Sequence, residues 1–447
     1  MQKIRIKNFG PIKEVEIEID KVLLLIGEQA SGKSTTAKLI YFFRSLPDIL
    51  WHVIVEYQPK EMIDKFEEQV TKKFIEYFGT NLYTLGFEIN YAYSIDEAKS
   101  IQLSIDNGKV RTVIGDVLRS QLLNQKSCKL FTDFKKYSQS VKAQDALYKE
   151  QARQDLDEFV SDLLGNRQRL FYPAGRSVAV TYPDSVKLTF FGNLAGDLRT
   201  AGLSSTRGVG NQTLDLVLMA EFIQQSERLK DRFRNHDFST LIKERVALTD
   251  AVDLETLENA KEKIAKILRG EYRQDASGEK IYFSDNKYVF LSDAASGQQE
   301  IVRLVQDIFL ILLNQENAFR IIEEPEAHLW PMAQKYVIEL LALLLNGTDS
   351  QVVITTHSPY ILSVLNNLLY ATRVATLNGH EKEVSDVIDR RYWIDPQSFN
   401  IYFLSEGTCQ SVMDKRLGMI DQNLLDEISE VLGDEFDRLY TMRARAH

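Results

Sequence analysis

Residues 27–34 have the types and the spacing of a phosphate-binding loop, in which two glycines precede Lys33 and Ser34. The glycines allow the backbone to wrap closely and to aim several N–H groups at one point. Lys33 supplies a compact charge for the β- and γ-phosphates of a nucleoside triphosphate, and Ser34 offers a hydroxyl to Mg²⁺. The nucleotide-binding residues predicted here are Gly27, Glu28, Gln29, Ala30, Ser31, Gly32, Lys33, Ser34 and Thr35.

The segments on both sides of this loop fit the same interpretation. The apolar run at residues 22–26 predicts a buried strand, and residues 35–43 predict a helix. The positive N-terminal end of that helix would add to the anion site. The alternative, a glycine-rich turn that merely precedes a helix, is disfavoured by these flanks.

A second candidate anion site is the triplet Ser296, Gly297 and Gln298, which precedes an apolar helix at residues 301–310. A serine hydroxyl and the free backbone N–H groups of a helix end both point out of the helix. Taken alone, the triplet favours an ordinary helix cap, with Glu300 completing a capping pattern. Its place among the other motifs makes it a candidate nucleotide contact.

Two further strands are predicted to end in polar residues, at the position where ligands bind in α/β sheets. Glu323 follows an apolar run and could reach the Mg²⁺ directly or through water. Glu324 could orient and deprotonate the attacking water. His357 ends a β-branched run and could contact the γ-phosphate and sense its presence. The alternatives are an acidic first helical turn and a structural histidine. The predicted catalytic residues are therefore Lys33, Glu324 and His357, with Ser34 and Glu323 at the metal.

The order of these motifs resembles the ABC-type ATPase head. More narrowly, the chain resembles the SMC-like branch of bacterial ATPases, which includes the overcoming-lysogenization-defect nucleases and the ATPase subunits of anti-phage systems such as PtuA and AriA. The resemblance covers about residues 1–45 and 165–372. The segments that carry it are residues 3–12, 172–176, 296–300, 324–329 and 356–359.

The resemblance implies an α/β fold, that of an ABC-type P-loop ATPase head. From the residues themselves we expect inserted antiparallel strands and a helical arm but no long coiled coil, because the candidate helices are too short and interrupted. The resemblance also implies that two heads pack head-to-tail, with each ATP between the phosphate loop of one subunit and Ser296 of the other. Two departures from the branch are visible. Glu323 stands where an Asp is usual, and no glutamine loop is recognisable. Arg176 lies where that loop would be, either as a nucleotide contact or as a structural arginine.

Length and composition agree with a multi-unit globular protein. The chain has 447 residues, of which 44% are hydrophobic and 26% are charged. Cys128 and Cys409 cannot form a disulfide framework, and no signal peptide or transmembrane run is recognisable, so we expect a cytoplasmic protein without a membrane partner. The net charge of −10 disfavours broad nucleic-acid binding. Lys126, Lys129, Lys135 and Lys136 cluster, and for these a solvated helix face is favoured over a basic binding face, although the second alternative leaves DNA open as a partner.

The organisation along the chain predicts an ATPase head interrupted by insertions. Alternating apolar residues around the turn signal at 106–108 predict antiparallel strands, residues 400–404 predict another strand, and residues 421–439 predict a final helix. We divide the chain into ATPase lobe I at 1–114, a helical insertion at 115–165, a return to the ATPase core at 166–212, a helical arm or interface at 213–280, ATPase lobe II at 281–372, and a C-terminal strand and helix at 373–447.

The segment after His357 lacks the acidic pattern of the metal-dependent nuclease that some relatives of this branch carry there. We therefore expect an ATPase without intrinsic nuclease activity. It would form a homodimer or larger homo-oligomer, and it would sense or regulate in anti-phage defence together with a separately encoded effector, a nuclease. The alternative is a DNA-repair or chromosome-maintenance ATPase that clamps DNA directly. The nucleotide-binding subunit of a membrane transporter fits less well, because of the large insertions.

Overall fold

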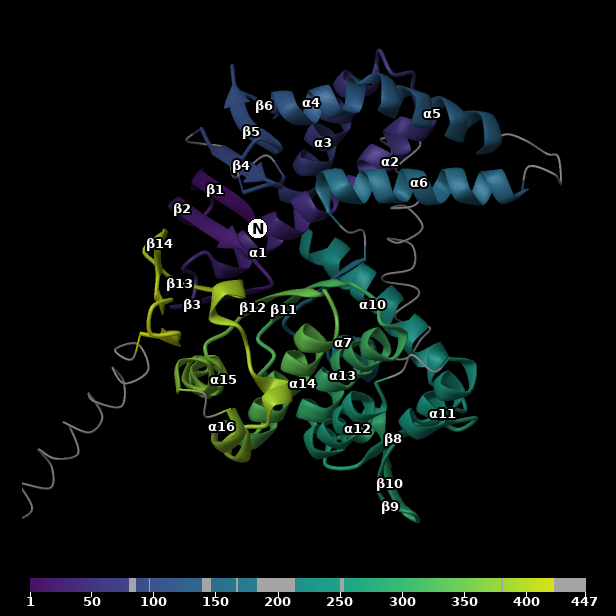
Figure 1. Ribbon diagram of the computed structural model, residues 1–447, viewed down its shortest axis with the longest axis vertical. Coiled ribbons are helices and arrows are strands. Elements are labelled where there is room, and N and C mark those ends of the chain that lie inside the picture. The colour runs from purple at the N-terminus through teal and green to yellow at the C-terminus, as the bar shows by residue number, and fades with distance from the viewer. Residues whose placement is uncertain are drawn as a thin grey trace, which may run out of the picture.

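The computed structural model describes residues 1–79, 86–95, 97–138, 146–165, 168–182, 214–249, 253–378 and 381–421. Its centre is an 11-stranded sheet in the order β6-β5-β4-β1-β2-β14-β13-β3-β12-β11-β7 (Figure 1). The strands are β1 Gln2–Phe9, β2 Ile12–Ile19, β3 Val22–Gly27, β4 Glu88–Ala92, β5 Ser100–Asp106, β6 Lys109–Ile114, β7 Arg169–Tyr172, β11 Phe319–Glu323, β12 Gln351–Thr355, β13 Phe399–Ser405 and β14 Thr408–Ser411.

The strands β13, β3, β12, β11 and β7 run parallel, and their register fixes where each one ends. Leu25 of β3 lies opposite Thr355 of β12, and Thr355 lies opposite Glu323 of β11. The carboxyl ends of these three strands therefore meet at one edge of the sheet. This is the edge at which α/β sheets bind their ligands.

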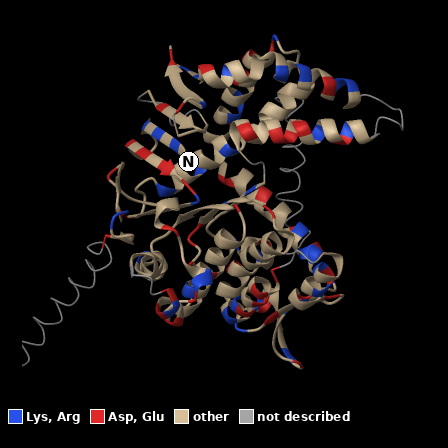
Figure 2. Cartoon of the chain, viewed as in Figure 1, with Lys and Arg blue, Asp and Glu red and all other residues tan. Residues whose placement is uncertain are grey.

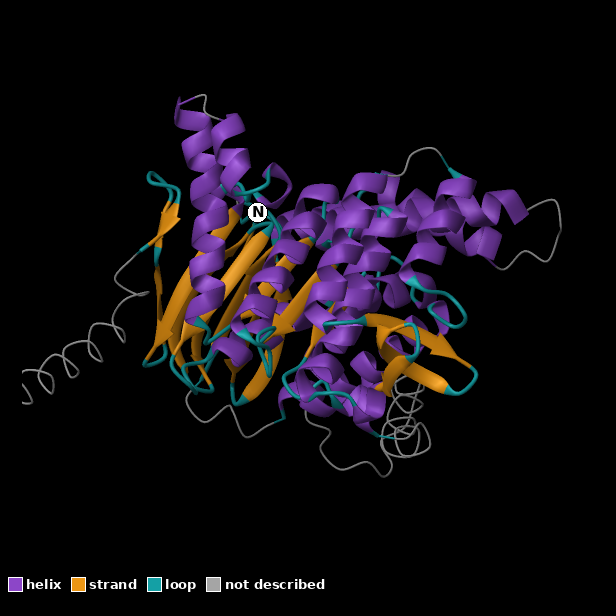
Figure 3. Ribbon diagram, turned by 90° about the horizontal axis from the view of Figure 1, so that it is seen from below, coloured by secondary structure: helices purple, strands orange, loops and turns teal. Residues whose placement is uncertain are grey.

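Helices cover both faces of the sheet, as Figure 3 shows. The helices on one face are α1 Lys33–Arg44, α2 Leu46–Glu56, α3 Met62–Phe78, α4 Asp116–Leu123, α5 Gln125–Ser138 and α6 Ala146–Leu164. The main helices on the other face are α12 Leu254–Leu268, α13 Ser296–Asn314, α14 Pro331–Gly347 and α15 Pro359–Asn378.

The sequence of β3 explains this double covering. Leu23 and Leu25 face the core under α1, whereas Val22, Leu24 and Ile26 face the core under α13 and α14. A strand buried on both faces needs a continuous apolar run rather than an alternating one. The strand and the helix predicted around the phosphate loop are both confirmed, with the helix starting at Lys33.

The inserted antiparallel strands extend the sheet on the side of β1. Strands β4, β5 and β6 form a meander next to β1, and β5 and β6 are joined by a tight turn. Asn107 and Gly108 both have positive φ, at 50° and 74°. That is the geometry of the two-residue turns whose twist matches the strands. The hairpin predicted at residues 106–108 is thus confirmed.

The region assigned to a helical arm, residues 213–280, has helices over 214–232, 238–248 and 254–268 among its described residues. They are α10 Leu214–Arg232, α11 Phe238–Leu248 and α12, and the chain then changes to a small sheet of β8 Glu271–Asp275, β9 Gly278–Ser284 and β10 Lys287–Phe290. Arg269 ends α12 in a left-handed conformation with φ of 50°, directly before Gly270. The helical periodicity of the arm stops there because this pair turns the chain.

The C-terminal strands do not form an appendage. β13 pairs with β3, and β14 lies between β13 and β2, so residues 399–411 join the two halves of the sheet. The carbonyl of Gly407, in the turn between them, accepts the N–H groups of Lys13 and Glu14 at 2.8 and 3.1 Å. The strand predicted at 400–404 is confirmed, although its central position was not foreseen. The helix predicted at 421–439 lies outside the described residues, apart from residue 421.

The remaining described elements are short. They are α7 Val178–Thr181, α16 Glu381–Val387, the 3₁₀ turns η3 Leu291–Asp293, η4 Arg390–Tyr392 and η5 Pro396–Ser398, and the strand pair β15 Met413–Asp414 and β16 Met419–Ile420. The longest described helix has 20 residues, so the described chain contains no long coiled-coil arm. None of the described helices is both long and apolar enough to span a bilayer. The predicted α/β ATPase head with inserted strands is confirmed as the fold.

Figure 2 shows that charges of both signs occur along the outer helices α5 and α6. The four clustered lysines, Lys126, Lys129, Lys135 and Lys136, all lie on α5. Two of them have local partners: Lys135 donates to the carbonyl of Tyr57, and the ammonium of Lys136 lies over the ring of Tyr137. Whether this helix contacts nucleic acid stays a prediction.

A buried ion pair connects α13 to the sheet. The guanidinium of Arg320 on β11 donates to both oxygens of Asp307, at 2.6 and 3.0 Å, and also to the carbonyl of Gln168 at 3.1 Å. The arginine and the aspartate are both buried. A two-pronged contact of this kind fixes the rotation of α13 about its axis more strictly than apolar packing does.

We predict that Arg320→Met lowers the free energy of unfolding by roughly 3–5 kcal/mol, because it leaves the Asp307 carboxylate buried without its partner. The double variant Arg320→Met/Asp307→Leu should recover most of this loss, since it leaves no uncompensated charge. Urea denaturation followed by circular dichroism measures both values. Equal losses in the single and the double variant would contradict the assignment.

Candidate nucleotide-binding site

The phosphate loop has the backbone shape that its sequence predicts. Gly27, Ala30 and Gly32 have positive φ, at 137°, 61° and 103°. A Cβ on Gly27 would lie 2.0 Å from the carbonyl oxygen of Leu404, and a Cβ on Gly32 would lie 2.9 Å from a side-chain carbon of Ile12. Both glycines are therefore required by close approach as well as by conformation.

Lys33 is held across the loop. Its ammonium donates to the carbonyl oxygens of Gly27 and Glu28, at 2.8 and 2.6 Å, and lies 3.4 Å from the hydroxyl of Ser31. Burial lowers the pKa of Lys33, and the charges of Glu324 and Glu28 act in the opposite direction. An anion close to this ammonium would favour its charged form. The lysine thus fits a triphosphate, whose oxygens can replace the two carbonyls.

The other loop residues divide by exposure. Glu28, Gln29, Ala30 and Ser34 are exposed, Thr35 is half-buried and Ser31 is buried. Ser34 lies in the first turn of α1, beside Lys33, so its hydroxyl is accessible to a metal ion on a bound nucleotide. The side of the loop formed by these exposed residues is therefore accessible to a ligand from solvent.

Glu323, the last residue of β11, is the candidate metal ligand from the strand ends. One oxygen of its buried carboxylate accepts the N–H of Ala174 at 3.3 Å. The other oxygen is buried and has no hydrogen-bond partner. A buried carboxylate oxygen without a partner is unfavourable unless a proton or a cation compensates it. Glu323 and Ser34 are therefore a chemically suitable pair for Mg²⁺, which prefers oxygen ligands and keeps several waters and phosphate oxygens.

Glu324 and His357 lie next to each other at the same edge. The His357 Nε2 is 3.7 Å from a carboxylate oxygen of Glu324, and both side chains are a little over 40% exposed. Glu324 has φ of 43°, an uncommon value for a residue other than glycine, and its N–H donates to the carbonyl of Thr355 at 2.9 Å. An exposed carboxylate beside an imidazole is suited to accept a proton from water.

Glu326 is a residue whose role was not predicted from the sequence. One carboxylate oxygen accepts the hydroxyl of Thr356 at 2.6 Å and the backbone N–H of His357 at 2.9 Å. It therefore links the loop after β11 to the loop after β12 and positions His357. The sequence feature that could have indicated this role is the position of Glu326, two residues after the predicted catalytic Glu324.

The Ser-Gly-Gln triplet opens α13, but its three residues behave differently. Ser296 is exposed in the first turn, and Ala295 rather than the serine occupies the N-cap position. A Cβ on Gly297 would lie 2.5 Å from the carbonyl oxygen of His328, so this glycine permits a close approach. The amide of Gln298 accepts the N–H of Ala295 at 3.1 Å and donates to the carbonyl of Leu268 at 2.6 Å.

These contacts correct two details of the prediction. Gln298 has a capping role in this structure, because both ends of its amide are bonded to the backbone. Ser296 is not the capping residue and remains the exposed member of the triplet. Among the described residues, no hydrogen bond or ion pair joins Ser296 to residues 27–35. Within the described part of the chain, the two predicted anion sites are therefore not directly linked.

Arg176 has a fully buried guanidinium. Its sequence position had made it a candidate nucleotide contact. It donates to the main-chain carbonyls of Glu300, Glu323 and Glu324, at 3.0, 2.8 and 3.0 Å. Of the two roles that the sequence left open, these contacts favour the structural one.

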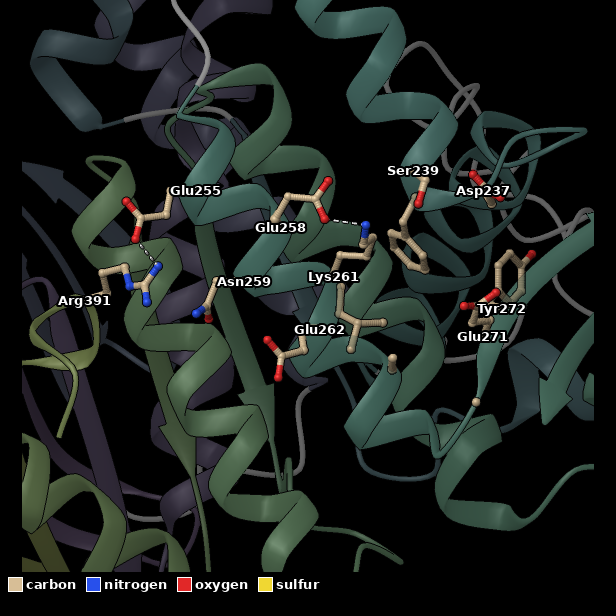
Figure 4. Close-up of a pocket in the computed structure, with 14 residues that line it drawn as sticks. Asp237, Ser239, Glu255, Glu258, Asn259, Lys261, Glu262, Glu271, Tyr272 and Arg391 are labelled. Carbon is tan, nitrogen blue, oxygen red and sulfur yellow. Dashed lines mark hydrogen bonds and ion pairs between the residues drawn. The ribbon is translucent and has the colours of Figure 1, made fainter. Parts of the chain in front are cut away.

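A separate cleft of about 590 Å³ lies between α11, α12, β8 and the turn at Arg391 (Figure 4). Its walls are rich in carboxylates, and two of these are paired with cations of the same walls. Glu255 binds Arg391 at 2.8 Å, and Glu258 binds Lys261. None of the predicted site residues lines this cleft.

The fold and the site together define a P-loop ATPase head. The sequence matches the AAA ATPase domain over residues 1–171 and 210–362, so the chain belongs to the AAA ATPase domain family. None of the curated proteins compared with the chain matches it.

Several solved structures are similar to the chain at low sequence identity. An SMC head bound to the C-terminal winged-helix domain of ScpA has a TM-score of 0.41 at 11% identity, covering 92% of this chain and 96% of that one. The SMC head domain from Thermotoga maritima has a TM-score of 0.37 at 11% identity, covering 92% and 97%. The recombination mediator RecF has a TM-score of 0.33 at 11% identity, with the same coverage.

We predict that Lys33→Ala abolishes ATP binding. Each charge-assisted contact to a phosphate contributes roughly 1.5–3 kcal/mol, so losing two of them weakens affinity by about a hundredfold or more. Titration with a fluorescent ATP analogue measures the change. Lys38→Ala is the matched control, because Lys38 lies on the same helix but forms an ion pair with Asp215 at 2.5 Å. Equal affinities for Lys33→Ala and the unchanged protein would refute the loop assignment.

Proposed function

We propose that this chain is a cytoplasmic ATPase whose heads form ATP-sandwiched, head-to-tail dimers. We further propose that it is the sensor or regulatory subunit of an anti-phage defence complex, with a separately encoded effector nuclease. The observation that carries the ATPase mechanism is the convergence of Lys33, Glu323, Glu324 and His357 at one sheet edge. The role in defence is supported only by the resemblance of the sequence motifs.

In the proposed mechanism, the side chains at this edge have separate roles in ATP hydrolysis. Lys33 and the loop N–H groups hold the triphosphate, and Ser34 with Glu323 would hold Mg²⁺, which offsets phosphate charge when bound. Glu324 orients a water molecule and accepts its proton as the water attacks the γ-phosphorus. His357 follows the neighbouring strand and lies beside Glu324. A γ-phosphate attacked by the water on Glu324 would therefore lie within reach of the imidazole.

The exposed position of Ser296 supports the dimeric part of the proposal. Within one chain this residue makes no described contact with the phosphate loop, although both carry features that suit a phosphate. A two-fold arrangement would bring each Ser296 to the nucleotide of the other subunit. ATP would then lie between the subunits and stabilise the dimer by binding only to the closed form.

Glu324→Gln should separate binding from hydrolysis. The substitution keeps the size of the side chain but removes the base, so we predict unchanged ATP affinity and a fall in hydrolysis of roughly 10²–10⁴-fold. Phosphate release and analytical ultracentrifugation with ATP should show a dimer that accumulates. If Glu324→Gln hydrolyses ATP like the unchanged protein, another residue is the base. Glu76→Gln, an exposed change on α3, is the control.

The same trapped variant tests the role in defence. When it is co-produced with the product of the neighbouring gene, the effector should be locked in one state, either held or released. The purified chain alone should cut neither plasmid nor linear DNA with Mg²⁺ or Mn²⁺. Cutting that disappears in a variant of its own acidic residues would place a nuclease in this chain. Salt-dependent DNA binding by the pure dimer would instead favour the DNA-clamping alternative.

Ser296→Arg should leave ATP binding to a single subunit intact but prevent the closed dimer, because a long side chain would fill the space for the opposing nucleotide. Size-exclusion chromatography with ATP measures dimer formation. Ser292→Arg, another exposed position just before α13, is the matched control. Mixing Ser296→Arg with Lys33→Ala subunits should restore at most one composite site. Full activity of the Ser296→Arg homodimer would rule out the sandwich.

A further inference from the structure

Arg176 contacts three separate parts of the ATPase head from a fully buried position. Its Nη1 and Nη2 donate to the carbonyls of Glu323 and Glu324, at the end of β11. Its Nε donates to the carbonyl of Glu300 in α13, and Nη1 is also 3.5 Å from the carbonyl of Pro173 in its own loop. One side chain therefore joins the end of β7, the end of β11 and the start of α13.

The contacts at β11 fall on the two residues that the mechanism needs most. Glu324 has the uncommon φ of 43°, and its backbone N–H and carbonyl are both hydrogen-bonded. Its N–H donates to Thr355, and its carbonyl accepts from Arg176. Such a conformation persists only where the surroundings hold it. Arg176 is thus part of what aims the Glu324 side chain toward solvent and His357.

The contact at α13 falls one helical turn after Ser296. Glu300 accepts a hydrogen bond from Arg176 with its carbonyl, and its buried carboxylate lies 3.6 Å from the same Nε. A displacement of the first turn of α13 would therefore be transmitted through the guanidinium to the peptide of Glu324. The planar, rigid guanidinium suits this role, because it keeps the directions of its N–H groups fixed relative to one another.

Two other buried arginines of this protein differ from Arg176, because their main partners are carboxylate side chains. Arg303 on α13 is paired with the carboxylate of Glu279 at 2.7 Å, and Arg320 is paired with Asp307 at 2.6 Å. Their charges are satisfied by carboxylate side chains away from Glu324. Arg176 instead directs most of its N–H groups to the backbone of the candidate catalytic segment.

We propose that Arg176 is a positioning residue for ATP hydrolysis, which holds the Glu323–Glu324 peptide in place and couples it to the first turn of α13. Occupation of the Ser296 end by the nucleotide of the opposing subunit then sets the position of Glu324, so hydrolysis follows dimer closure. This inference rests on the proposed ATPase mechanism and dimer.

Arg176→Lys tests the positioning role, because an ammonium cannot reach three carbonyls in the directions that a guanidinium does. We expect kcat to fall by roughly 10–100-fold, since a shift of about 1 Å in a catalytic group has effects of this size. KM and the Kd for ATP should stay within about threefold, because the phosphate loop is untouched. The matched control is Arg303→Lys, an equally buried arginine that does not contact Glu323 or Glu324.

The coupling to α13 is tested by combining each lysine variant with Ser296→Ala. The effects on kcat should be strongly non-additive for Arg176→Lys and additive for Arg303→Lys. If Arg176→Lys does not fold, Glu300→Gln replaces it, as this change removes the carboxylate beside Arg176 while keeping its size. Glu300→Gln should then lower kcat several-fold at constant KM.

The outcomes distinguish this inference from the proposed function. If the unchanged protein hydrolyses no ATP, the proposed function fails. If it hydrolyses ATP and Glu324→Gln is inactive, but Arg176→Lys loses no more kcat than Arg303→Lys, the positioning role alone is refuted. A rise in KM without a fall in kcat would also refute it, because that result would make Arg176 a binding residue.

Discussion

The parallel register of β3, β12 and β11 is the constraint on which the rest of the molecule depends. Because Leu25, Thr355 and Glu323 lie opposite one another, the residues that follow each strand emerge at the same level. The phosphate loop, the loop of His357 and the loop of Glu324 are thereby brought together, and Glu326 joins the last two through Thr356 and the N–H of His357. The insertions extend the sheet or cover its faces, and they leave this edge unaltered.

Helix α13 shows how an apolar element is held in one orientation. Most of its residues are buried, and apolar packing alone would tolerate small rotations of such a helix. Three of its charged residues, Glu300, Arg303 and Asp307, meet partners on three different elements. Buried pairs of this kind add little net stability, but separating the partners is costly, so arrangements of the helix that leave one of them unpaired are disfavoured. Of the three pairs, that of Glu300 with Arg176 lies next to the first turn of the helix, which carries Ser296.

The parts of the fold and site that were predictable are those encoded within a few residues of one another. The loop at 27–34, its flanking strand and helix, and the turn at Asn107 and Gly108 follow from local spacing and backbone preference. The roles of Gln298, Glu326 and Arg176 depend instead on groups distant in sequence. Gln298 donates to Leu268, and Arg176 donates to Glu300 and Glu323. Because these partners lie far away in the sequence, no local pattern predicts either contact.

The central position of β13 was unpredictable for a related reason. An apolar strand of this kind carries no mark of which strand it will pair with, and β13 pairs with β3 across almost the whole chain. The end of the helical arm, by contrast, is marked locally. Helical periodicity runs through α12, and the left-handed Arg269 followed by Gly270 ends it.

The place of β13 also matters while the protein is being made. Strand β3 and its phosphate loop leave the ribosome early, but the strand that covers one side of β3 is translated among the last of the described elements. Until then β3 has an open edge, and the loop lacks the carbonyl of Leu404 that lies against Gly27. A nascent or truncated chain without residues 399–405 would lack this support. A fragment that ends before residue 399 would therefore have an incompletely supported nucleotide site and would compete poorly for ATP.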